Sequence, residues 1–263
     1  MAEYDSHIRE HYASVAESAG LSSASTMADK MIRQRETEAI ESFVGLATGG
    51  RGRVADFGCG NGYTLEVLAD AYPEAELYGF EYTPELRELA AQRLDGRAKI
   101  APGDIRAPQF WGEDSFDAIV VQRVLINLLD PADQRASFEN IVRAVRPGGH
   151  VFFIECFIEP LADLNEAREE LGMEPIPPAH HNLYLEEGFY AHDDLIDFQH
   201  PDWVYVPNYM STHYFVSRAF EAGLTKDRPF KRNSQVQRFF SKALPPAIGN
   251  FGPLMFYAFT RRA

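Results

Sequence analysis

The sequence has 263 residues, of which 45% are apolar, and its 25 Lys and Arg against 39 Asp and Glu give a formal net charge of −14. Such a chain is long enough to bury a large core, and its negative charge opposes binding to a phosphate backbone, so we expect no nucleic-acid partner. Two cysteines are too few for a disulfide framework, and no apolar run suits a signal peptide or a membrane span. We therefore expect a cytoplasmic protein without membrane contacts.

The first 48 residues carry a helical pattern. Apolar side chains recur mostly at three- and four-residue intervals between Ser6 and Thr48. Gly20 and the Ser-rich stretch 22–26 divide the pattern into two helices. We expect residues 1–48 to form an N-terminal helical lid.

Short strands and helices alternate from residue 49 to residue 156. The predicted strands cover 53–57, 76–80, 98–101, 116–121 and 150–155, and the predicted helices cover 65–71, 84–94 and 131–145. Such βα units in series indicate a parallel, doubly wound sheet with right-handed crossovers.

The rhythm changes after Cys156. A helix over 163–171 and a long irregular stretch predict a cap insertion over 157–200 that covers a substrate site. Residues 201–263 are expected to complete the sheet, with a sixth strand at 202–206 and an antiparallel edge strand at 254–261. The predicted fold is thus one α/β domain with a seven-stranded, mostly parallel sheet.

The sequence from Asp56 to Gly62 places three alternating glycines between a strand and a helix. Glycines there let the backbone turn sharply and approach a ligand, at the edge where doubly wound folds bind nucleotides. The dinucleotide pattern fails because Tyr63 occupies the position of its third glycine, and an acidic residue precedes the turn.

Acidic residues follow the next two strands as well. Glu81 can accept hydrogen bonds from both hydroxyls of a ribose, and Asp104 can accept from an adenine amino group while Ile105 lies against the ring. Together with Asp56, these carboxylates suit S-adenosylmethionine, which carries a sulfonium, an ammonium group and a ribose diol.

With these motifs in this order, residues 53–155 resemble the class I S-adenosylmethionine-dependent methyltransferase family. The resemblance implies S-adenosylmethionine as cofactor, bound by Asp56, Gly58, Cys59, Gly60, Glu81, Tyr82, Asp104, Ile105 and Gln122. Arg33 or Arg35 could neutralise the carboxylate of the cofactor, although a solvated helix face explains both. A related fold that binds NAD, or has lost its ligand, stays open as an alternative.

In this family the segment after the fourth strand faces the transferred methyl group, and here it runs from Gln122 to Leu128. Many small-molecule members carry a histidine near the position of Asn127, and Arg123 suits either a substrate ligand or a structural ion pair. We expect the acceptor to be bound by Arg123, Asn127, Arg168, Asn182, Tyr184 and Arg218.

The candidate general bases are His180, His181 and His213, since imidazole changes protonation near neutral pH, and Tyr12 on the first helix is a further catalytic candidate. Each also suits a simple packing or loop role. The adjacent pair His180 and His181 has no companion at helical ligand spacing, so we expect no metal.

We therefore expect methyl transfer by in-line displacement to an oxygen or nitrogen of a small metabolite, in small-molecule biosynthesis. The motifs of amino-methylating nucleic-acid enzymes and of pyrimidine C5 enzymes do not occur. A protein or peptide methyltransferase and a non-catalytic cofactor-binding regulator remain the rivals, and a homodimer is compatible with the sequence.

Overall fold

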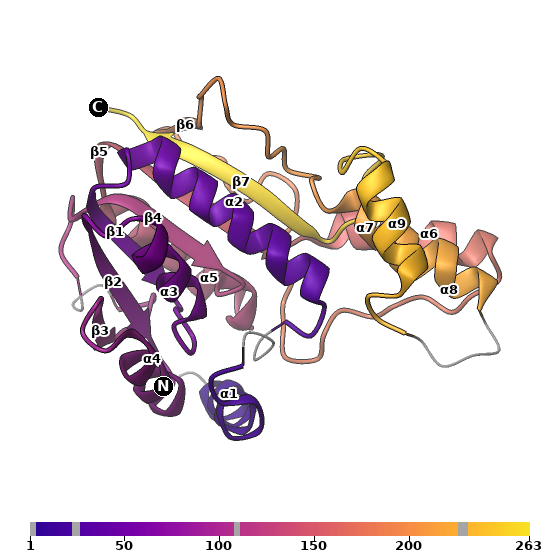
Figure 1. The fold of residues 1–263 in the computed structure, drawn as a ribbon, viewed down its shortest axis with the longest axis horizontal. Coiled ribbons are helices and arrows are strands. Elements are labelled where there is room, and N and C mark those ends of the chain that lie inside the picture. The colour runs from indigo at the N-terminus through magenta and orange to yellow at the C-terminus, as the bar shows by residue number, and fades with distance from the viewer. Residues whose placement is uncertain (1–3, 23–26, 108–110, 226–230) are drawn as a thin grey trace.

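The computed structural model describes residues 4–22, 27–107, 111–225 and 231–263. Its centre is a seven-stranded sheet (Figure 1). The strands are β1 (Gly52–Phe57), β2 (Ala75–Glu81), β3 (Lys99–Pro102), β4 (Phe116–Gln122), β5 (Val145–Cys156), β6 (Leu195–Asp197) and β7 (Leu254–Arg261). Their order is β3-β2-β1-β4-β5-β7-β6, with β1 to β5 in parallel pairs and β7 antiparallel to both of its neighbours. The predicted doubly wound sheet is confirmed.

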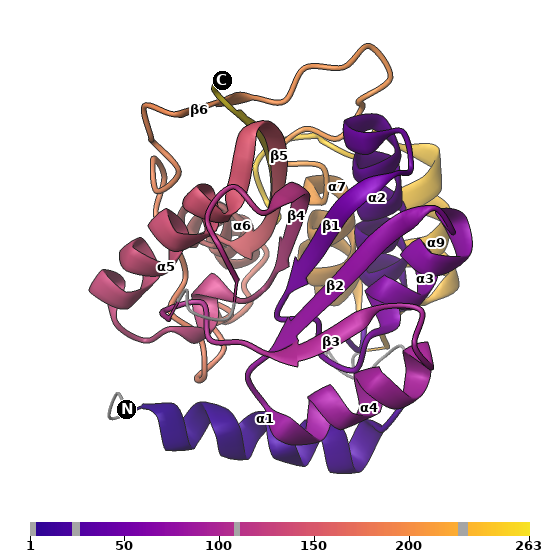
Figure 2. The ribbon, with the colours of Figure 1, turned by 90° about the vertical axis from the view of Figure 1, so that its left-hand side faces the viewer.

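Helices cover both faces of this sheet. They are α1 (Asp5–Ala19), α2 (Lys30–Thr48), α3 (Tyr63–Ala71), α4 (Pro84–Leu94), α5 (Pro131–Ala144), α6 (Ile158–Glu170), α7 (Ser211–Tyr214), α8 (Glu221–Leu224) and α9 (Gln235–Ala243), with a 3₁₀ turn η2 (Leu125–Asn127) and a π-helical segment η3 (Phe215–Phe220). Figure 2 shows α5 on one face and α2 with α3 on the other. The strand order reverses between β1 and β4, which is where open α/β sheets bind ligands.

Local chemistry explains several helix ends. The carboxylate of Asp29 accepts hydrogen bonds from the backbone of Met31 and Ile32 at the start of α2, and Gly49 ends that helix in the left-handed conformation. Pro131 occupies the first turn of α5 behind the capping Asp130. The sequence alone therefore indicates where these two helices begin and where α2 ends.

The core is built on strands buried from both sides. On β5, Phe152 and Phe153 point to opposite faces and both are fully buried. Each such side chain contributes about 2–3 kcal/mol of hydrophobic stabilisation. The central strands therefore hold the ends of β1, β2 and β4 in fixed positions.

The prediction of a strand at 202–206 is wrong. β6 lies earlier, at Leu195–Asp197. The N–H of Phe198 still donates to the carbonyl of Ala258 on β7. Beyond it the chain turns away from β7, and in this turn the N–H of Trp203 donates to the carbonyl of His200. The alternating pattern there reflects an extended loop whose aromatic side chains pack on the core.

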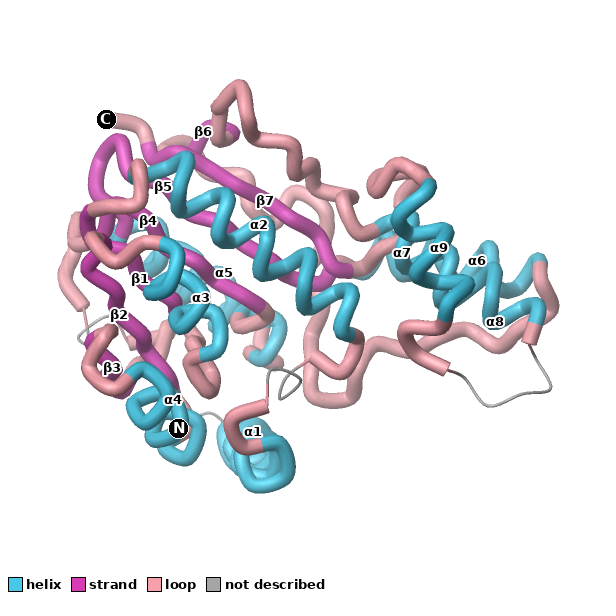
Figure 3. Tube along the Cα trace, viewed as in Figure 1, coloured by secondary structure: helices cyan, strands magenta, loops and turns pink. Residues whose placement is uncertain are grey.

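Among the described residues of 201–263, only β7 joins the sheet, whereas the helices of this part pack with α6 as a helical cap on one side of the sheet (Figure 3). Within the described residues, no helix is long and apolar enough to span a membrane.

Candidate active site

A cavity lies at the edge of the sheet where β1 to β4 end, and α1 crosses this edge (Figure 2). The lining combines residues that follow the strands with residues of α1. They include Asp56, Glu81, Asp104, Gln122, Ile8 and Tyr12. Of the predicted cofactor residues, Gly58, Cys59, Tyr82 and Ile105 also line it.

The glycine turn brings backbone close to the cavity. Gly58 has φ +80°, and a Cβ there would come within 2.4 Å of Cγ2 of Val124. Gly60 has φ +54° with open space around it, and its N–H donates to Oε2 of Glu81 over 2.8 Å. The turn after β1 is thus fixed to the end of β2, and the positive φ of Gly58 together with the nearby side chain of Val124 requires glycine at that position.

Two buried carboxyl groups face this cavity. Burial, and then the charge of Glu81, raises the pKa of Asp56 to about 7, against the opposing charge of Arg33. Burial also raises the pKa of Glu81, although hydrogen bonds from the backbone of Thr83 and Gly60 oppose this shift. Such paired acidic groups favour a cationic ligand, which would restore their ionised form.

The guanidinium of Arg33 and the side-chain amide of Gln122 lie close to these carboxyl groups. Nη1 of Arg33 is 3.4 Å from Oε1 of Gln122, and burial, together with the charge of Arg123, lowers the pKa of Arg33 to about 10. Nε2 of Gln122 is buried and has no hydrogen-bond partner among the described residues. Arg35 instead donates to the carbonyl of Ser241, so Arg33 is the better candidate for a ligand carboxylate.

The N-terminal helix is clamped over the cavity by Arg106, a residue that the sequence analysis missed. Its guanidinium donates to Asp5 on α1 and to Asp104 after β3, each over 2.7 Å. Tyr4 adds a hydrogen bond of 2.5 Å to Asp133 on α5. The predicted lid position of α1 is therefore observed, and Asp104 is engaged by Arg106 here, so its predicted contact with adenine stays a prediction.

At the other end of the cavity, three polar side chains meet. The hydroxyl of Tyr12 donates to Oδ1 of Asn127 over 3.0 Å, and Nδ2 of Asn182 donates to the same oxygen over 2.8 Å. Burial raises the pKa of Tyr12 to about 12. Tyr12 therefore acts near neutral pH as a hydrogen-bond donor and not as a base.

Arg123 lines the cavity and also forms a buried ion pair with Glu36 of α2. Its φ of +54° is unusual for a residue with a side chain. The carboxylate of Glu155 stabilises the turn after β4, because it accepts hydrogen bonds from the backbone N–H groups of Val124 and Leu125 over 2.7 and 2.9 Å. The ion pair with Glu36 and the position at the cavity thus coexist in Arg123.

The predicted general bases lie in two different parts of the fold, with His180 and His181 beside η2 and His213 in the helical cap. The segment that holds His180 and His181 runs along η2, because the N–H of Leu183 donates to the carbonyl of Ile126 over 2.8 Å. This places both histidines beside Asn182, whose side chain contacts the cavity-lining Asn127. Tyr184 follows them, half-buried against the core, and is not part of the described cavity lining.

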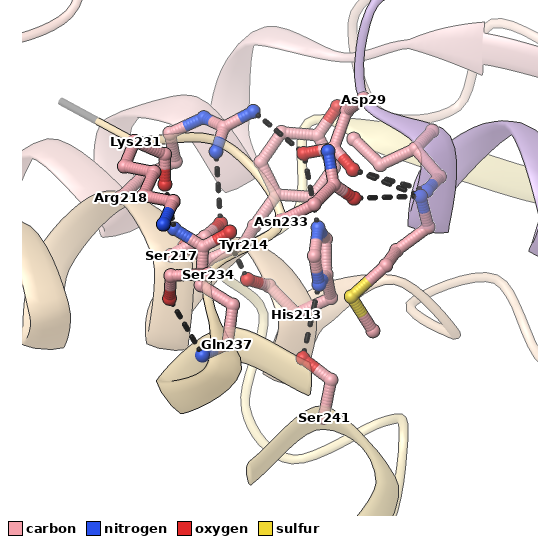
Figure 4. Close-up of polar contacts among 12 residues, drawn as sticks. Asp29, His213, Tyr214, Ser217, Arg218, Lys231, Asn233, Ser234, Gln237 and Ser241 are labelled. Atoms are coloured by element: carbon pink, nitrogen blue, oxygen red, sulfur yellow. Dashed lines mark hydrogen bonds and ion pairs between the residues drawn. The ribbon is translucent and has the colours of Figure 1, made fainter. Parts of the chain in front are cut away.

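His213 lies in the helical cap. Its ring nitrogens contact Ser241 Oγ at 3.0 Å and Asp29 Oδ2 at 3.2 Å, and Arg218 binds the same Asp29 oxygen (Figure 4). Although the order Ser, His, Asp matches a hydrolytic triad, all three side chains are buried, with at most 2% exposed. The network instead fixes the start of α2 to α7 and α9.

Arg168 is also in the cap, where it donates to backbone carbonyls of Glu174 and Arg218. Arg168, Arg218 and His213 do not appear in the cavity lining of the described residues. Their predicted substrate and catalytic roles stay predictions.

The sheet order, the glycine turn and the acidic end of β2 define a class I methyltransferase fold. Residues 54–149 match the family model described as a methyltransferase domain. The chain thus carries a class I S-adenosylmethionine-dependent methyltransferase domain, as the motifs predicted.

Two curated relatives match part of the chain. Nodulation protein S of Rhizobium tropici is 32% identical over 121 residues, 46% of this chain and 50% of that protein. A malonyl-[acyl-carrier protein] O-methyltransferase of Hahella chejuensis is 29% identical over 147 residues, 55% of this chain and 51% of that protein. The chain spans about half the length of these relatives.

Among solved structures, the [4+2]-cyclase SpnF superposes with a TM-score of 0.55 at 14% identity, covering 88% of this chain and 81% of that one. This likeness concerns the fold alone.

Proposed function

We propose that this protein transfers a methyl group from S-adenosylmethionine to an oxygen or nitrogen of a small molecule. The observation that carries the proposal is the cavity at the ends of β1 to β4, where Asp56 and Glu81 lie beside Arg33 and Gln122. Acidic and cationic groups side by side match a ligand that carries both an ammonium group and a carboxylate.

Each part of the cofactor has a matching group in this cavity. Asp56 would accept from the ammonium group, and Arg33 with the free Nε2 of Gln122 would bind the carboxylate. Glu81 would accept from the ribose hydroxyls, since each of its oxygens uses one lone pair on backbone N–H groups of Gly60 or Thr83. When bound, S-adenosylmethionine would supply a methyl group from its positively charged sulfur, and that sulfur would leave as the neutral thioether of S-adenosylhomocysteine as the acceptor bonds to the methyl carbon.

The chain contributes mainly alignment and exclusion of water. α1 closes the cavity, and Tyr12 and Asn127 offer fixed polar groups that would orient the acceptor. An acceptor carboxylate, as in the reaction named for the malonyl relatives, is already ionised at neutral pH and needs no base. A hydroxyl or ammonium acceptor would require one, and His180 or His181 remains the predicted candidate.

Calorimetric titration with S-adenosylmethionine, S-adenosylhomocysteine and NAD tests the cofactor. We expect micromolar binding of the first two, weak or no binding of NAD, and a loss of at least about tenfold for Asp56→Ala. Preference for NAD, or no binding at all, would refute the proposal.

A regulator that binds the cofactor without turnover is the rival from another class. It has the same cofactor contacts, so binding cannot separate the two. Transfer of a labelled methyl group to malonyl thioesters, amines or hydroxylated metabolites would support the enzyme, whereas tight binding without transfer to any of them would favour the regulator. Label on proteins instead would indicate a protein methyltransferase.

A further inference from the structure

Three histidines from distant parts of the chain meet near Tyr12 and Asn182, the two residues that donate to Asn127. His11 lies on α1, while His180 and His181 lie in the irregular segment after α6. One ring nitrogen from each lies within 4.8 Å of those from the other two. The companion that the sequence pattern did not supply for the adjacent pair thus comes from the lid helix.

The rings are already close packed. His11 and His181 are stacked, with ring centroids 3.9 Å apart and planes 21° from parallel. His180 stands edge-on, with its centroid 5.0 Å from that of His181 and 6.2 Å from that of His11. These distances place the three rings around one point between α1 and the segment of residues 180–183.

The neighbours of these histidines hold the two segments together. Tyr12, next to His11, and Asn182, next to His181, both donate to the same oxygen of Asn127. This shared acceptor fixes α1 against the segment of residues 180–183. The approach of α1 to the segment that carries His180 and His181 is therefore held by hydrogen bonds outside the three rings.

We propose that His11, His180 and His181 form a binding site for a divalent transition-metal ion of the zinc type. Neutral imidazole nitrogens are good ligands for zinc at 2.0–2.1 Å, which puts ligand atoms about 3.3 Å apart in a tetrahedral site. The ring nitrogens lie within 4.8 Å of one another, so the stacked rings of His11 and His181 must rotate about their side-chain bonds to reach that spacing. Magnesium and calcium prefer oxygen ligands and are disfavoured.

Three protein ligands leave a fourth coordination position open for water or for an acceptor atom. The ion would also tie α1 to the segment of residues 180–183 and so hold the lid closed next to Tyr12. His180 is exposed, which gives the ion a path from solvent. The site requires only the chain itself, so this inference stands apart from the proposed methyl transfer.

Titration of chelator-treated protein with zinc chloride near pH 7.5, without S-adenosylmethionine, tests the proposal. We expect one ion per chain with micromolar or tighter affinity, and at least a tenfold loss in each of His11→Ala, His180→Ala and His181→Ala. His200→Ala is the matched control, since that histidine lies in a separate turn and accepts from the N–H of Asp202. It should bind zinc like the parent protein.

Cobalt substitution gives a second readout in variants that fold. We expect the visible absorption of a four-coordinate cobalt site in the parent protein and its loss in His180→Ala, which removes an exposed side chain and should leave the fold intact. Absence of zinc binding below the millimolar range would overturn the proposal. So would zinc affinity unchanged in all three variants, or cobalt absorption that persists in His180→Ala.

Discussion

The ionisation of Asp56 predicts how cofactor affinity depends on pH. Its pKa is raised to about 7, chiefly by burial and then by Glu81. A cationic ligand favours the ionised carboxylate, so binding should release a proton and affinity should rise as pH increases through 7. The sign follows because the free protein holds more protons on this group than the complex does.

The magnitude follows from the ionised fraction. With a pKa of about 7, roughly one tenth of Asp56 is ionised at pH 6 and nine tenths at pH 8. If only the ionised form binds S-adenosylmethionine, the dissociation constant should fall roughly tenfold between these two pH values. About half a proton should be released per ligand bound at pH 7.

Calorimetry across this pH range, repeated at pH 7 in two buffers with different ionisation enthalpies, measures both quantities. Asp56→Asn keeps the shape of the side chain and removes its charge, so we expect weaker binding, by about 10-fold or more, and a flatter pH profile. Asp70→Asn is the matched control, because Asp70 is an exposed surface residue paired with Arg97. Affinity that does not change with pH, or a parental pH profile in Asp56→Asn, would refute this reasoning.

Three further predictions concern other parts of the molecule. Tyr12→Phe removes the hydrogen bond to Asn127, worth about 1 kcal/mol, so kcat/KM for the acceptor should fall about fivefold. Arg106→Gln releases Asp5, so hydrogen exchange in α1 should speed up about tenfold and cofactor affinity should fall. Asp29→Asn breaks the buried cap network and should lower the free energy of unfolding in urea by about 3 kcal/mol.

The network around Asp29 also has a pH dependence with a definite sign. Burial opposes its ionisation, but the hydrogen bond and charge of His213 and the charge of Arg218 outweigh this and lower its pKa. Its stabilising effect is present above about pH 4 and is lost as pH falls.

Three outcomes would contradict the predictions for these variants. They are a urea midpoint in Asp29→Asn equal to that of the parent, unchanged acceptor kinetics in Tyr12→Phe, and unchanged hydrogen exchange of α1 in Arg106→Gln.

The sheet could be predicted because its signals are local. The helix from Pro84 to Leu94 and the strand from Leu254 to Arg261 have the predicted bounds, since a proline marks the start of the helix and an apolar run rich in aromatic residues marks the strand. The strand expected at 202–206 failed because alternation alone cannot tell a paired strand from an extended loop.

The cofactor end of the site was predictable because its residues follow successive strands whose ends meet at one edge. The contacts of α1 were not, since Arg106 and Asp5 are far apart in the sequence and neither belongs to a motif. Likewise, nothing in the sequence indicated that His213 lies against Asp29 and Ser241. Long-range packing decides such roles, and periodicity carries no information about it.

Incubation of the protein with S-adenosylmethionine labelled in its methyl group and a metabolite extract, followed by separation by size, tests the central claim most directly. We predict label in the low-mass fraction with the parent protein and little or none with Asp56→Asn. Label confined to the protein fraction, or no transfer despite measured cofactor binding, would contradict a small-molecule methyltransferase.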